Sequence, residues 1–566
     1  MYVDIETVRQ RVVDPRTAVP TQFGWLDEGE ETAQWSRCDH TLLDRIDGST
    51  TLTGHNIAGF DWPILFRHGS RYPREFHDSM LMASVLGYQD LSLKGLSQEL
   101  FGIQTVGYEQ AEEGDPNYLA QDLFLTRRLA TTLDAQIEGT AYDIDRSLIP
   151  MLTEASYRGY EIDQEKVRAR VTAAEAARDR AAAMCQPLLP PRMCGDCRDG
   201  QRPWHCLVGH LMSKAGVCRG QHRSEGVGEW ILCKTCAGTG QLAVSMGSYE
   251  QLQEALGVET TGAEFLKELV NRGGPLSEPA QWILLYREHA DLLTKYLYKM
   301  QKRERFTGLF NLSPNEEGED GTTAGRLSSR IENMQNLDPR AYSCLRAPEG
   351  YLLLTWDLSQ IELRWAAEAS DSEYLIEAFR NGRDLHQETT DLLGLPDRQA
   401  GKRWNFATLY GAEEYRLSTI TGKSTSWCAD ALGRFRVGPW RDFFEWGDRH
   451  WATVQRSSYS VSPEPFLHRR YIPLLNAKHA KKAAVNHPIQ CGAVYTTKAA
   501  MYELDKSLPL FVNQVHDAAH YYVPDTVDPD LTKRDVYETL REIGQKYLPR
   551  VGIDATVSLG KYWEAK

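Results

Sequence analysis

The chain has 566 residues, too many for one hydrophobic core, so we expect about two to four domains. A hydrophobic content of 42%, no apolar run of membrane-spanning length and a strand-like N-terminus predict a soluble cytoplasmic protein with no membrane partner. The formal net charge of −14 counts against a nucleic-acid partner only weakly. Carboxylates around metal ions can make the total negative while basic segments such as Tyr286–Arg305 still bind phosphate.

Residues 1–140 alternate strand-like and helix-like segments, and they carry spaced acids. The strand "YVDIET" places Asp4 and Glu6 on one face, the segment "HNIAGFD" adds Asp61, and "YLAQD" places Tyr118 and Asp122 side by side on a helix. Each acid alone is equally well read as a surface residue. Four converging carboxylates would repel each other unless divalent cations lay between them, which is the arrangement that two-metal phosphodiester hydrolysis requires.

This set resembles the DEDD-type 3′→5′ exonuclease domain, an RNase-H-like fold, that is attached to family A (polymerase-I-like) DNA polymerases. The resemblance implies that the four acids bind Mg²⁺ and that Tyr118 positions the attacking water. All five expected residue types are present. We therefore expect residues 1–140 to form an active proofreading domain.

Residues 147–184 read as a helical segment, and the composition then changes abruptly. The stretch 185–245 is rich in Gly, Pro and Cys and holds six of the eleven cysteines, which in a cytosolic protein favours metal binding over disulfides. Two C-x2-C pairs suit a tetrahedral Zn²⁺: Cys194, Cys197, Cys233 and Cys236. A second candidate tetrad lies between them: Cys206, His210, Cys218 and His222.

Buried free cysteines would not explain this crowding in a segment so poor in apolar residues, which could not fold on hydrophobic burial alone. We therefore expect one structural zinc ion, with a second as a further candidate. The insert could clamp duplex DNA, bind a helicase, a single-strand binding protein or a processivity factor, or only stabilise the fold. The sequence does not choose among these roles.

Two C-terminal segments each present an acid at a strand end. The apolar strand in "YLLLTWDLSQIELRWAAEAS" ends in Asp357 and runs into a helix. In Leu510–Pro524, "LFVNQVHDAAHYYVP", two apolar runs flank His516 and Asp517, where an ionised carboxylate is costly unless it is paired. A hairpin there could bring Asp517 beside Asp357. Two acids with two Mg²⁺ ions would serve phosphoryl transfer.

Between these segments, Arg398, Lys402, Phe406 and Tyr410 recur every four residues and form one stripe on a predicted helix. Two cations followed by two rings suit a nucleotide, with its phosphates at the basic end and its sugar and base against the rings. A core-facing stripe would fit Phe406 or Tyr410 alone. It does not fit the two cations unless anions pair with them.

These segments resemble the polymerase half of family A: "DLSQIELR" its motif A, "RQAGKRWNFATLYG" its motif B and "QVHDA" its motif C. The resemblance extends to "TTAGRLSSRIENMQNLDPR", "DLHQETTDLLGL" and "KKAAVNHPIQCGAVYTTKAAM", and so to nearly the whole chain outside the Cys-rich insert. It implies an α/β and α+β multidomain protein. The exonuclease domain would be followed by a right-hand polymerase, with the palm start and thumb in 141–335 and the palm and fingers in 336–566, the fingers over roughly 372–485.

The resemblance also implies roles for single residues. Asp357 and Asp517 would bind the two catalytic Mg²⁺ ions. The nucleotide site would hold the triphosphate on Arg398 and Lys402 and the sugar on Phe406, with Tyr410 at the templating position, Glu362 against a ribose 2′-OH, and Gln360 and His386 nearby. Since Phe stands where Tyr would tolerate dideoxynucleotides, discrimination against them is expected. The DNA contacts would come from Arg326, Arg364, Asn486, Gln490 and His516, the last at the primer terminus.

Two positions depart from the family pattern. Leu358 stands where motif A usually has Tyr, and little should change because the backbone carbonyl is the usual ligand there. Ala518 stands where motif C usually has Glu. The lost acid is the auxiliary one, so we expect polymerisation to survive with a weaker or altered metal requirement; loss of polymerase activity is the alternative.

Together these patterns predict a monomeric, template-directed DNA polymerase with proofreading that uses primer–template DNA, dNTPs, Mg²⁺ and structural Zn²⁺. Because the chain begins on the first exonuclease strand, without a 5′-nuclease domain, we expect a bacteriophage replication enzyme. Two rival hypotheses are a nuclease whose polymerase half only binds primer–template, and a zinc-dependent DNA-binding or scaffold protein with both sites dead. The intact motif B argues against the first rival, and the exonuclease acids argue against the second.

Overall fold

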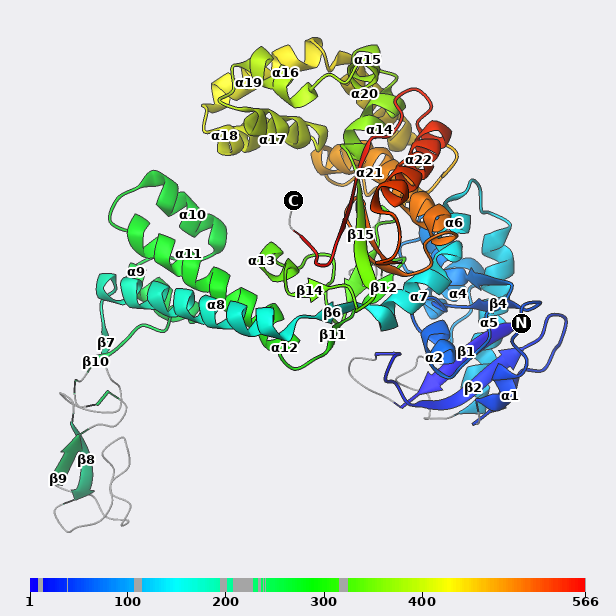
Figure 1. Cartoon of the computed structure of the whole chain (residues 1–566), viewed down its shortest axis with the longest axis horizontal. Coiled ribbons are helices and arrows are strands. Elements are labelled where there is room, and N and C mark those ends of the chain that lie inside the picture. Colours follow the sequence, from blue (N-terminus) through cyan, green and yellow to red (C-terminus); the bar gives the residue numbers. More distant parts are fainter. Residues whose placement is uncertain are drawn as a thin grey trace. The chain divides into compact units, whose positions relative to one another are not determined.

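A computed structural model describes residues 1–8, 14–37, 39–105, 115–193, 201–206, 227–232, 236–237, 239, 241–314 and 324–564 (Figure 1). These residues form two compact units. The first comprises Met1–Glu161, Arg305–Leu337 and Leu345–Glu564, and the second Ile162–Glu304 and Asp338–Cys344. None of the described helices is both long and apolar enough to cross a membrane.

The N-terminal part of the first unit is built on a sheet of order β3-β2-β1-β4-β5. Its strands are β1 (Tyr2–Thr7), β2 (Pro20–Leu26), β3 (Gln34–Ser36), β4 (Thr51–Gly54) and β5 (Glu75–Asp78). Strand β1 runs antiparallel to β2 and parallel to β4. Buried Val3, Ile5 and Thr7 alternate along β1 with half-buried Asp4 and Glu6, so the strand period places both acids on the face opposite these buried side chains.

Helices follow these strands where the sequence supplies capping residues. Asp78 accepts from the amides of Met80 and Leu81 at the start of α3, and Asp115 precedes Pro116 at the start of α5. The helices of this part are α1 (His40–Leu43), α2 (Asp61–Arg67), α3 (Ser79–Leu86), α4 (Leu93–Phe101), α5 (Pro116–Asp134), α6 (Ala141–Ser147) and α7 (Ile149–Arg158).

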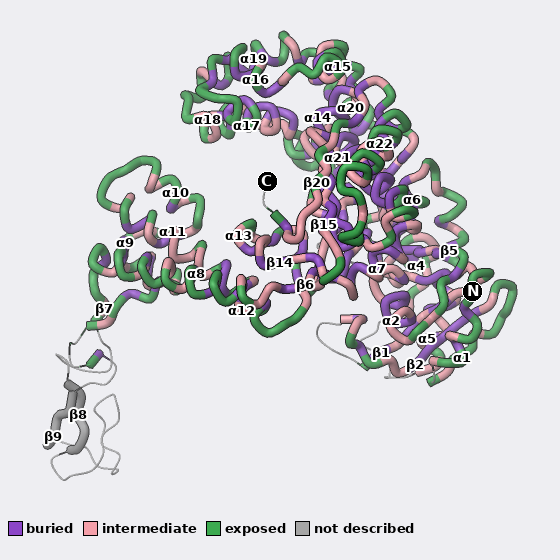
Figure 2. Tube along the Cα trace, in the orientation of Figure 1, coloured by how far each residue is buried: buried purple, intermediate pink, exposed green. Residues whose placement is uncertain are grey.

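The C-terminal part of the first unit contains an antiparallel sheet of order β18-β19-β15-β20. The strands are β15 (Tyr351–Leu358), β18 (Phe511–Val515), β19 (Ala518–Pro524) and β20 (Ala555–Gly560). The same part contains three helices: α14 (Ile361–Ser370), α21 (Ala477–Asp505) and α22 (Pro529–Tyr547). Trp356, Trp365 and Tyr521 are fully buried here, and Figure 2 shows buried residues concentrated along this sheet and along α14 and α21.

A helical subdomain lies between β15 and α21 in the chain and packs on the buried side chains Trp404, Phe435 and Trp440. Its helices are α15 (Glu373–Arg380), α16 (Leu385–Leu393), α17 (Arg398–Leu409), α18 (Glu414–Thr421), α19 (Thr425–Val437) and α20 (Arg441–Ser457). The remaining strands are β16 (Tyr459–Val461) with β17 (Arg469–Tyr471), β12 (Leu309–Asn311) with β13 (Ser328–Arg330), and a three-stranded set of β11 (Arg305–Phe306), β6 (Tyr160–Ile162) and β14 (Leu345–Arg346).

The predicted helical segment 147–184 is interrupted by β6. Gly159 ends α7 with a φ of +50°, and a Cβ there would lie 2.3 Å from the carbonyl oxygen of Phe306. Only glycine fits this turn, so the helix stops and a strand pairs before α8 begins. Gly159 is the sequence signal for this interruption, but the helical pattern on both sides of it conceals that signal.

The second unit is mostly helical. Its elements are α8 (Gln164–Cys185), η1 (Gln186–Leu188), α9 (Tyr249–Leu256), α10 (Ala263–Arg272), α11 (Ser277–Asp291), the π-helical η2 (Leu292–Leu297), α12 (Tyr298–Met300) and α13 (Pro339–Tyr342), with strand pairs β7 (Arg192–Met193) with β10 (Gln241–Leu242) and β8 (Gln201–Cys206) with β9 (Val227–Leu232). Its core includes Cys185, Leu252, Leu266 and Ile283. The basic segment Tyr286–Arg305 is helical up to Met300.

Candidate active sites

Two acids meet at one edge of the C-terminal sheet. Asp357, near the end of β15, pairs in register with Ala518, the first residue of β19. Asp517 precedes Ala518 in the tight turn between β18 and β19, and its carbonyl accepts a 3.0 Å hydrogen bond from the amide of Leu358. The turn therefore brings Asp517 next to the end of the strand that carries Asp357.

The electrostatics of this edge fit a bound cation. The pKa of Asp517 is raised to about 7, chiefly by burial and also by the negative charges of Glu362 and Asp357, while Arg326 opposes the shift. A carboxyl group held in this way ionises fully when a cation compensates its charge. Carboxylate oxygens are also the ligands that Mg²⁺ prefers, so Asp357 and Asp517 fit a magnesium site.

Polar side chains hold the turn that carries Asp517. His516 adopts a φ of +54° and is exposed, which a non-glycine residue does only when its surroundings fix the backbone. The side-chain amide of Gln514 donates to the carbonyl of His516, and Gln335 donates to Gln514 over 3.0 Å. Asn513 donates to the carbonyl of Met334 over 2.9 Å. The contact of His516 with a primer terminus stays a prediction.

Two predicted site residues from separate segments, Arg326 and Tyr410, meet at a third, Glu362. Helix α14 starts directly after Gln360, which has a φ of +53°, and Glu362 in its first turn is only 7% exposed. Arg326 donates to the Glu362 carboxylate over 2.6 Å, and the hydroxyl of Tyr410 donates to its other oxygen. Burial and the charge of Glu362 raise the pKa of Tyr410, so its hydroxyl stays protonated and remains a donor.

Helix α17 presents the predicted basic stripe. Arg398 at its first turn pairs with Asp384 over 2.5 Å, and Lys402 one turn further on is exposed. Phe406 follows, half-buried, with its ring centroid 5.9 Å from that of His386. The two cations therefore precede the ring along one helix, as the four-residue spacing predicts.

His386 is a buried imidazole beside this stripe. It is 1% exposed, and Asn405 lies 3.1 Å from its Nδ1. Its Nε2 has no hydrogen-bond partner among the described residues. The pKa of His386 is lowered to about 4, chiefly by burial and also by the charge of Arg398, so the ring is neutral at pH 7.

Asn486 and Gln490 lie one turn apart on α21, and both are half-buried. Asn486 also lines a cavity of 360 Å³ together with Lys478, Lys481 and Lys482. These three lysines were not among the residues predicted from the sequence, although their spacing on one helix is a visible signal. All three pair with acids: Lys478 and Lys482 with Glu413 over 3.4 and 4.0 Å, and Lys481 with Asp448 over 2.5 Å.

Arg364 has a structural environment. Its side chain donates to the backbone carbonyls of Ser359 and Gly552 over 2.9 and 3.2 Å, and its guanidinium stacks 4.6 Å from the ring of Phe379. The residue is 8% exposed. In this arrangement Arg364 ties β15 and α14 to the segment before β20, and the predicted DNA contact has no support from its position.

The second acidic group lies on the N-terminal sheet. Asp61 at the start of α2 accepts a 2.9 Å hydrogen bond from the amide of Ile5, which places it beside Asp4. Burial raises the pKa of Asp4 to about 6, and burial and the charge of Asp4 raise that of Asp61. One carboxylate oxygen of Asp4, Oδ2, is buried without a hydrogen-bond partner among the described residues. These two acids fit a divalent cation.

Helix α5 supplies Tyr118 and Asp122 to the same region, with Lys94 of α4 between them. Lys94 forms an ion pair with Asp122, lies 4.6 Å above the ring of Tyr118, and lowers the pKa of Asp4. Through these contacts, Asp4, Asp61, Tyr118 and Asp122 lie in one region of the N-terminal part. Glu6 lies on the same face of β1 as Asp4. Lys94 was missed because nothing in "SLKGLS" marks its lysine as a site residue.

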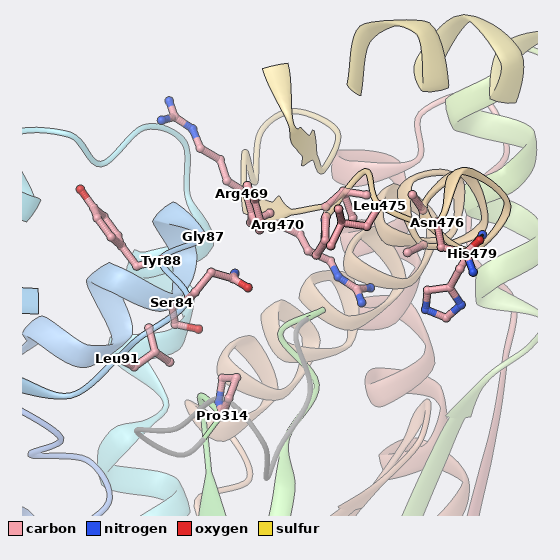
Figure 3. Close-up of a pocket in the computed structure, with 16 residues that line it drawn as sticks. Ser84, Gly87, Tyr88, Leu91, Pro314, Arg469, Arg470, Leu475, Asn476 and His479 are labelled. Atoms are coloured by element: carbon pink, nitrogen blue, oxygen red, sulfur yellow. The ribbon is translucent and has the colours of Figure 1, made fainter. Parts of the chain in front are cut away.

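A cavity of 520 Å³ opens between α3 and the segment from β17 to α21 (Figure 3). Tyr88, Arg470 and His479 are among its lining residues. Burial lowers the pKa of Arg470, and this arginine has no ion-pair partner within the described part of the chain. The neighbouring Arg469 instead pairs with Glu138 over 2.8 Å. The cavity could not be predicted from the sequence, because it forms only from distant segments.

Most of the predicted zinc ligands lie outside what the structure describes. Cys194, Cys197, His210, Cys218, His222 and Cys233 fall outside the described residues, and for Cys206 only the strand backbone is described. Cys236 is described and is 6% exposed. Both zinc sites therefore stay predictions.

Comparisons with known proteins agree with the C-terminal geometry. Residues 239–565 match the family model described as DNA polymerase family A. The DNA polymerase I of Streptococcus pneumoniae is 29% identical over 337 residues, which cover 54% of this chain and 37% of that protein. The thermostable DNA polymerase I of Thermus aquaticus is 30% identical over 336 residues, covering 55% of this chain and 39% of that protein. The chain thus spans well under half the length of these relatives.

A solved structure is similar over almost the whole chain. It is the "POL domain of Pol1 from M. smegmatis complex with DNA primer-template and dNTP", and the two chains superpose with a TM-score of 0.74. The match covers 99% of this chain and 96% of that one at 19% sequence identity. At this identity the likeness shows the fold.

Proposed function

Because the chain belongs to DNA polymerase family A, we propose that it adds deoxynucleotides to a primer 3′ end as a template directs, and that a second site removes mismatched 3′ ends. The observation that carries the first activity is the juxtaposition of Asp357 and Asp517, with the pKa of Asp517 raised to about 7. Relatives named DNA polymerase I support the same reading.

In this proposal Asp357 and Asp517 hold Mg²⁺, which family A polymerases use generally. When bound, Mg²⁺ neutralises phosphate charge and lowers the barrier to attack by the primer 3′-hydroxyl. Arg398 and Lys402 bind the triphosphate by charge-assisted hydrogen bonds, and Phe406 packs against the sugar. Arg398 is already oriented by its ion pair with Asp384.

Sugar selection follows from the environment of Glu362. Because Arg326 and Tyr410 both hydrogen-bond its buried carboxylate, Glu362 is fixed in place and cannot move aside for a ribose 2′-hydroxyl. A deoxyribose carries only hydrogen at that position. Deoxynucleotides are therefore preferred, and a flexible acid at the same position would discriminate less.

The DNA partner is proposed from the chemistry of three groups. Arg326, Asn486 and Gln490 offer donors suited to the acceptors that every base pair presents in the minor groove. The similar polymerase domain from M. smegmatis was solved in complex with a DNA primer–template and dNTP, which supports the same ligand class here.

The exonuclease activity is proposed from the N-terminal acids. Asp61 is buried beside half-buried Asp4, and the pKa values of both are raised. Lys94 pairs with Asp122 and lies over the ring of Tyr118, which places both residues in the same region. With divalent metal, such acids orient a water for attack on the terminal phosphodiester. Proofreading, the zinc-binding insert with its partner proteins, the monomeric state, the cytoplasmic location and the bacteriophage origin stay predictions.

The test is a crossed assay on an end-labelled primer–template. Wild-type protein, Asp357→Asn, Asp4→Asn and the exposed-acid control Asp530→Asn are compared with and without dNTPs. We expect Asp357→Asn to degrade the primer without extending it, and Asp4→Asn to extend it without degrading it. Asp530→Asn should behave as wild type, since Asp530 lies on the surface of α22.

Two outcomes would overturn the proposal. Wild-type protein that degrades the primer but never extends it, across Mg²⁺ and Mn²⁺, would leave only a nuclease. Wild-type protein that binds primer–template but neither extends nor degrades it would leave a DNA-binding protein.

A further inference from the structure

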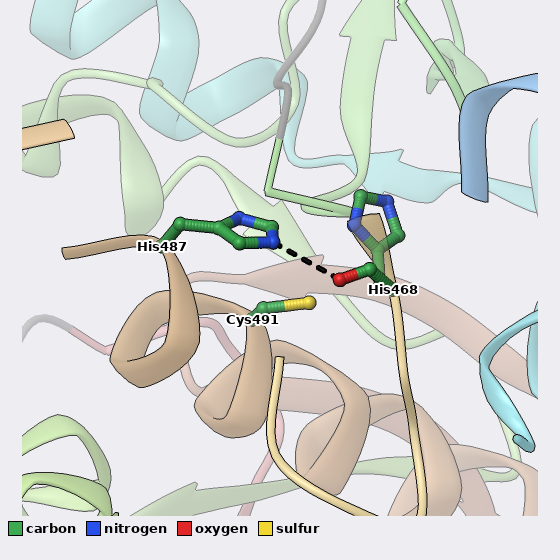
Figure 4. A group of neighbouring side chains, drawn as sticks. All are labelled: His468, His487 and Cys491. Carbon is green, nitrogen blue, oxygen red and sulfur yellow. Dashed lines mark hydrogen bonds between the residues drawn. The ribbon is translucent and has the colours of Figure 1, made fainter. Parts of the chain in front are cut away.

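A compact group of metal-ligand side chains lies outside both acidic sites. His468 precedes β17, and His487 and Cys491 lie one turn apart on α21, all three drawn in Figure 4. One ligand atom from each lies within 4.8 Å of those of the other two. His468 is 2% exposed, and His487 and Cys491 are fully buried.

The two imidazoles are set up as lone-pair donors. Nε2 of His487 lies 3.2 Å from the carbonyl oxygen of His468 and so acts as the N–H donor. In a neutral ring this leaves Nδ1 of His487 with its lone pair free. Nδ1 of His487 and Nδ1 of His468 are both buried without a hydrogen-bond partner in the described part of the chain. A buried polar atom without a partner is uncommon in folded proteins, and a bound ion or water satisfies it.

The hydrogen bond from His487 to the carbonyl of His468 is of a kind common in metal sites. A ligating histidine commonly donates its other ring N–H to a carbonyl or carboxylate, which fixes the tautomer and orients the ring. Ser462 hydrogen-bonds with Cys491 and accepts from the amide of His468 over 2.8 Å, which ties the two segments together.

We propose that His468, His487 and Cys491 bind one transition-metal ion, with Zn²⁺ the expected ion. Two imidazoles and one thiolate are the ligand types that zinc takes in structural sites. Binding exchanges the thiol proton for a Cys491 sulfur–zinc bond and releases that proton to solvent. Bonds of about 2.0 to 2.3 Å place tetrahedral ligand atoms roughly 3.5 Å apart, so the three side chains close inward on binding. Water or the Ser462 hydroxyl takes the fourth position.

The site would be structural. It joins the segment before β17 to α21 next to Pro488, where the helix lacks a backbone donor, and His487 lies between Asn486 and Gln490 in the chain. The ion would therefore stiffen the stretch of helix that presents these two polar side chains. The proposal does not depend on polymerase activity, because its readouts are metal content, spectra and stability.

The first experiment separates this site from the cysteine-rich insert. Chelator-treated full-length wild type, Cys491→Ala and the control Cys428→Ala are titrated with Co²⁺ and followed by thiolate-to-metal absorption. Cys428 is also a fully buried free cysteine, but it contacts Thr421 on helices outside the cluster. We expect Cys491→Ala to take up one equivalent less than wild type. We expect Cys428→Ala to match wild type and His468→Gln to bind at least tenfold more weakly at this site.

Equal uptake by wild type and Cys491→Ala would overturn the proposal, because the insert would then supply every binding site. The deciding measurement needs no variant. Crystals of the wild-type protein soaked in Zn²⁺ should give an anomalous peak at the zinc edge between His468, His487 and Cys491. Zinc peaks elsewhere without one at this position would refute the site, even if Cys491→Ala fails to fold.

Discussion

At the scale of single residues, both proposed activities depend on which carboxylates lie together in partly buried sites. Asp517 and Asp4 have pKa values raised to about 7 and about 6 by burial, whereas many surface acids of the chain pair with Lys or Arg. Such buried acids are costly to the fold, and cation binding offsets that cost. Burial also raises the pKa values of Asp78 and Asp505 to about 6, so a raised pKa supports the motif residues without singling them out.

Ala518 allows a direct test of the missing third acid. It pairs opposite Asp357 and is 7% exposed, so a glutamate there would add negative charge beside the Asp357–Asp517 pair. We predict that Ala518→Glu lowers the Mg²⁺ concentration for half-maximal primer extension by about fivefold, or roughly 1 kcal/mol. Ala518→Gln, which has the same size without the charge, should not. An unchanged Mg²⁺ dependence would mean that the two aspartates suffice.

The buried histidine beside the basic stripe predicts a pH dependence of stability. The pKa of His386 is about 4 in the folded protein, against about 6.5 in the unfolded chain. Between pH 6.5 and 4, His386 takes up a proton in the unfolded state and stays unprotonated in the folded state. Stability is therefore full above pH 6.5 and falls by about 1.4 kcal/mol per pH unit as the pH drops toward 4.

The measurement is urea unfolding of wild type and His386→Gln at pH 7.5 and 5.5. Acids with raised pKa values, such as Asp517, titrate in the same range with the opposite sign, so the difference between the two proteins isolates His386. The variant should lose less stability on acidification than wild type. Parallel losses would contradict a neutral buried His386.

Most site residues could be predicted because their signal is local. A strand end delivers Asp357, and a four-residue repeat aligns Arg398, Lys402 and Phe406. Lys94 and Arg364 are residues for which a local signal in the sequence is insufficient. Lys94 reaches Asp122 only through the packing of α4 on α5, and Arg364 turns inward because carbonyls from the segment before β20 accept its donors. No local pattern encodes either contact.

At the scale of secondary-structure elements, α21 is the one that most needs explanation. It runs from Ala477 to Asp505 with Pro488 inside it, so the carbonyl of Ala484 loses its usual amide partner. The hydroxyl of Ser460 donates to that carbonyl over 2.9 Å, and His450 lies 2.9 Å from the same hydroxyl. A side chain from the neighbouring strand β16 thus replaces the missing helical hydrogen bond.

We predict that Ser460→Ala destabilises the protein by about 1 to 3 kcal/mol, because it removes the hydroxyl donor from the buried Ala484 carbonyl and the hydroxyl partner from His450. Ser457→Ala, at an exposed hydroxyl on α20, is the matched control and should be nearly neutral. Thermal or urea unfolding measures both. A Ser460→Ala variant as stable as wild type would show that Pro488 is accommodated in another way.

Element types were easier to predict than their interruptions. The helical pattern of 147–184 concealed β6, since Gly159 acts through its close approach to Phe306, a residue distant in sequence. The hairpin around Asp517 was predictable because two apolar runs flank a short polar turn. Contacts between distant segments determine where β6 forms, whereas the local sequence of apolar and polar residues determines the hairpin.

At the scale of the whole molecule, the described residues form two units. The first carries both acidic groups, and the second carries the helices α8 to α12 and the cysteine-rich stretch. The chain order of the acids predicted two separate active sites. The role of the insert could not be predicted, because its composition indicates metal binding without indicating a partner.

The insert predicts a measurable metal content. Protein purified without chelators should contain about one zinc ion held by the C-x2-C pairs, and Cys194→Ser with Cys197→Ser should remove it. Elemental analysis with thiol titration measures both, and Cys428→Ser serves as the control. Less than about half an equivalent of zinc lost, with thiols freely titratable in wild type, would contradict this site.

The central claim is that Asp357 and Asp517 form one metal-dependent polymerase site. Single-turnover incorporation of the next complementary dNTP, by an Asp4→Asn protein in which degradation is suppressed, tests it most directly. Adding Asp517→Asn should slow incorporation by at least about a thousandfold, roughly 4 kcal/mol of transition-state stabilisation, with primer–template binding unchanged. Incorporation at the unaltered rate, or Mg²⁺-independent incorporation by the Asp4→Asn protein, would contradict this claim.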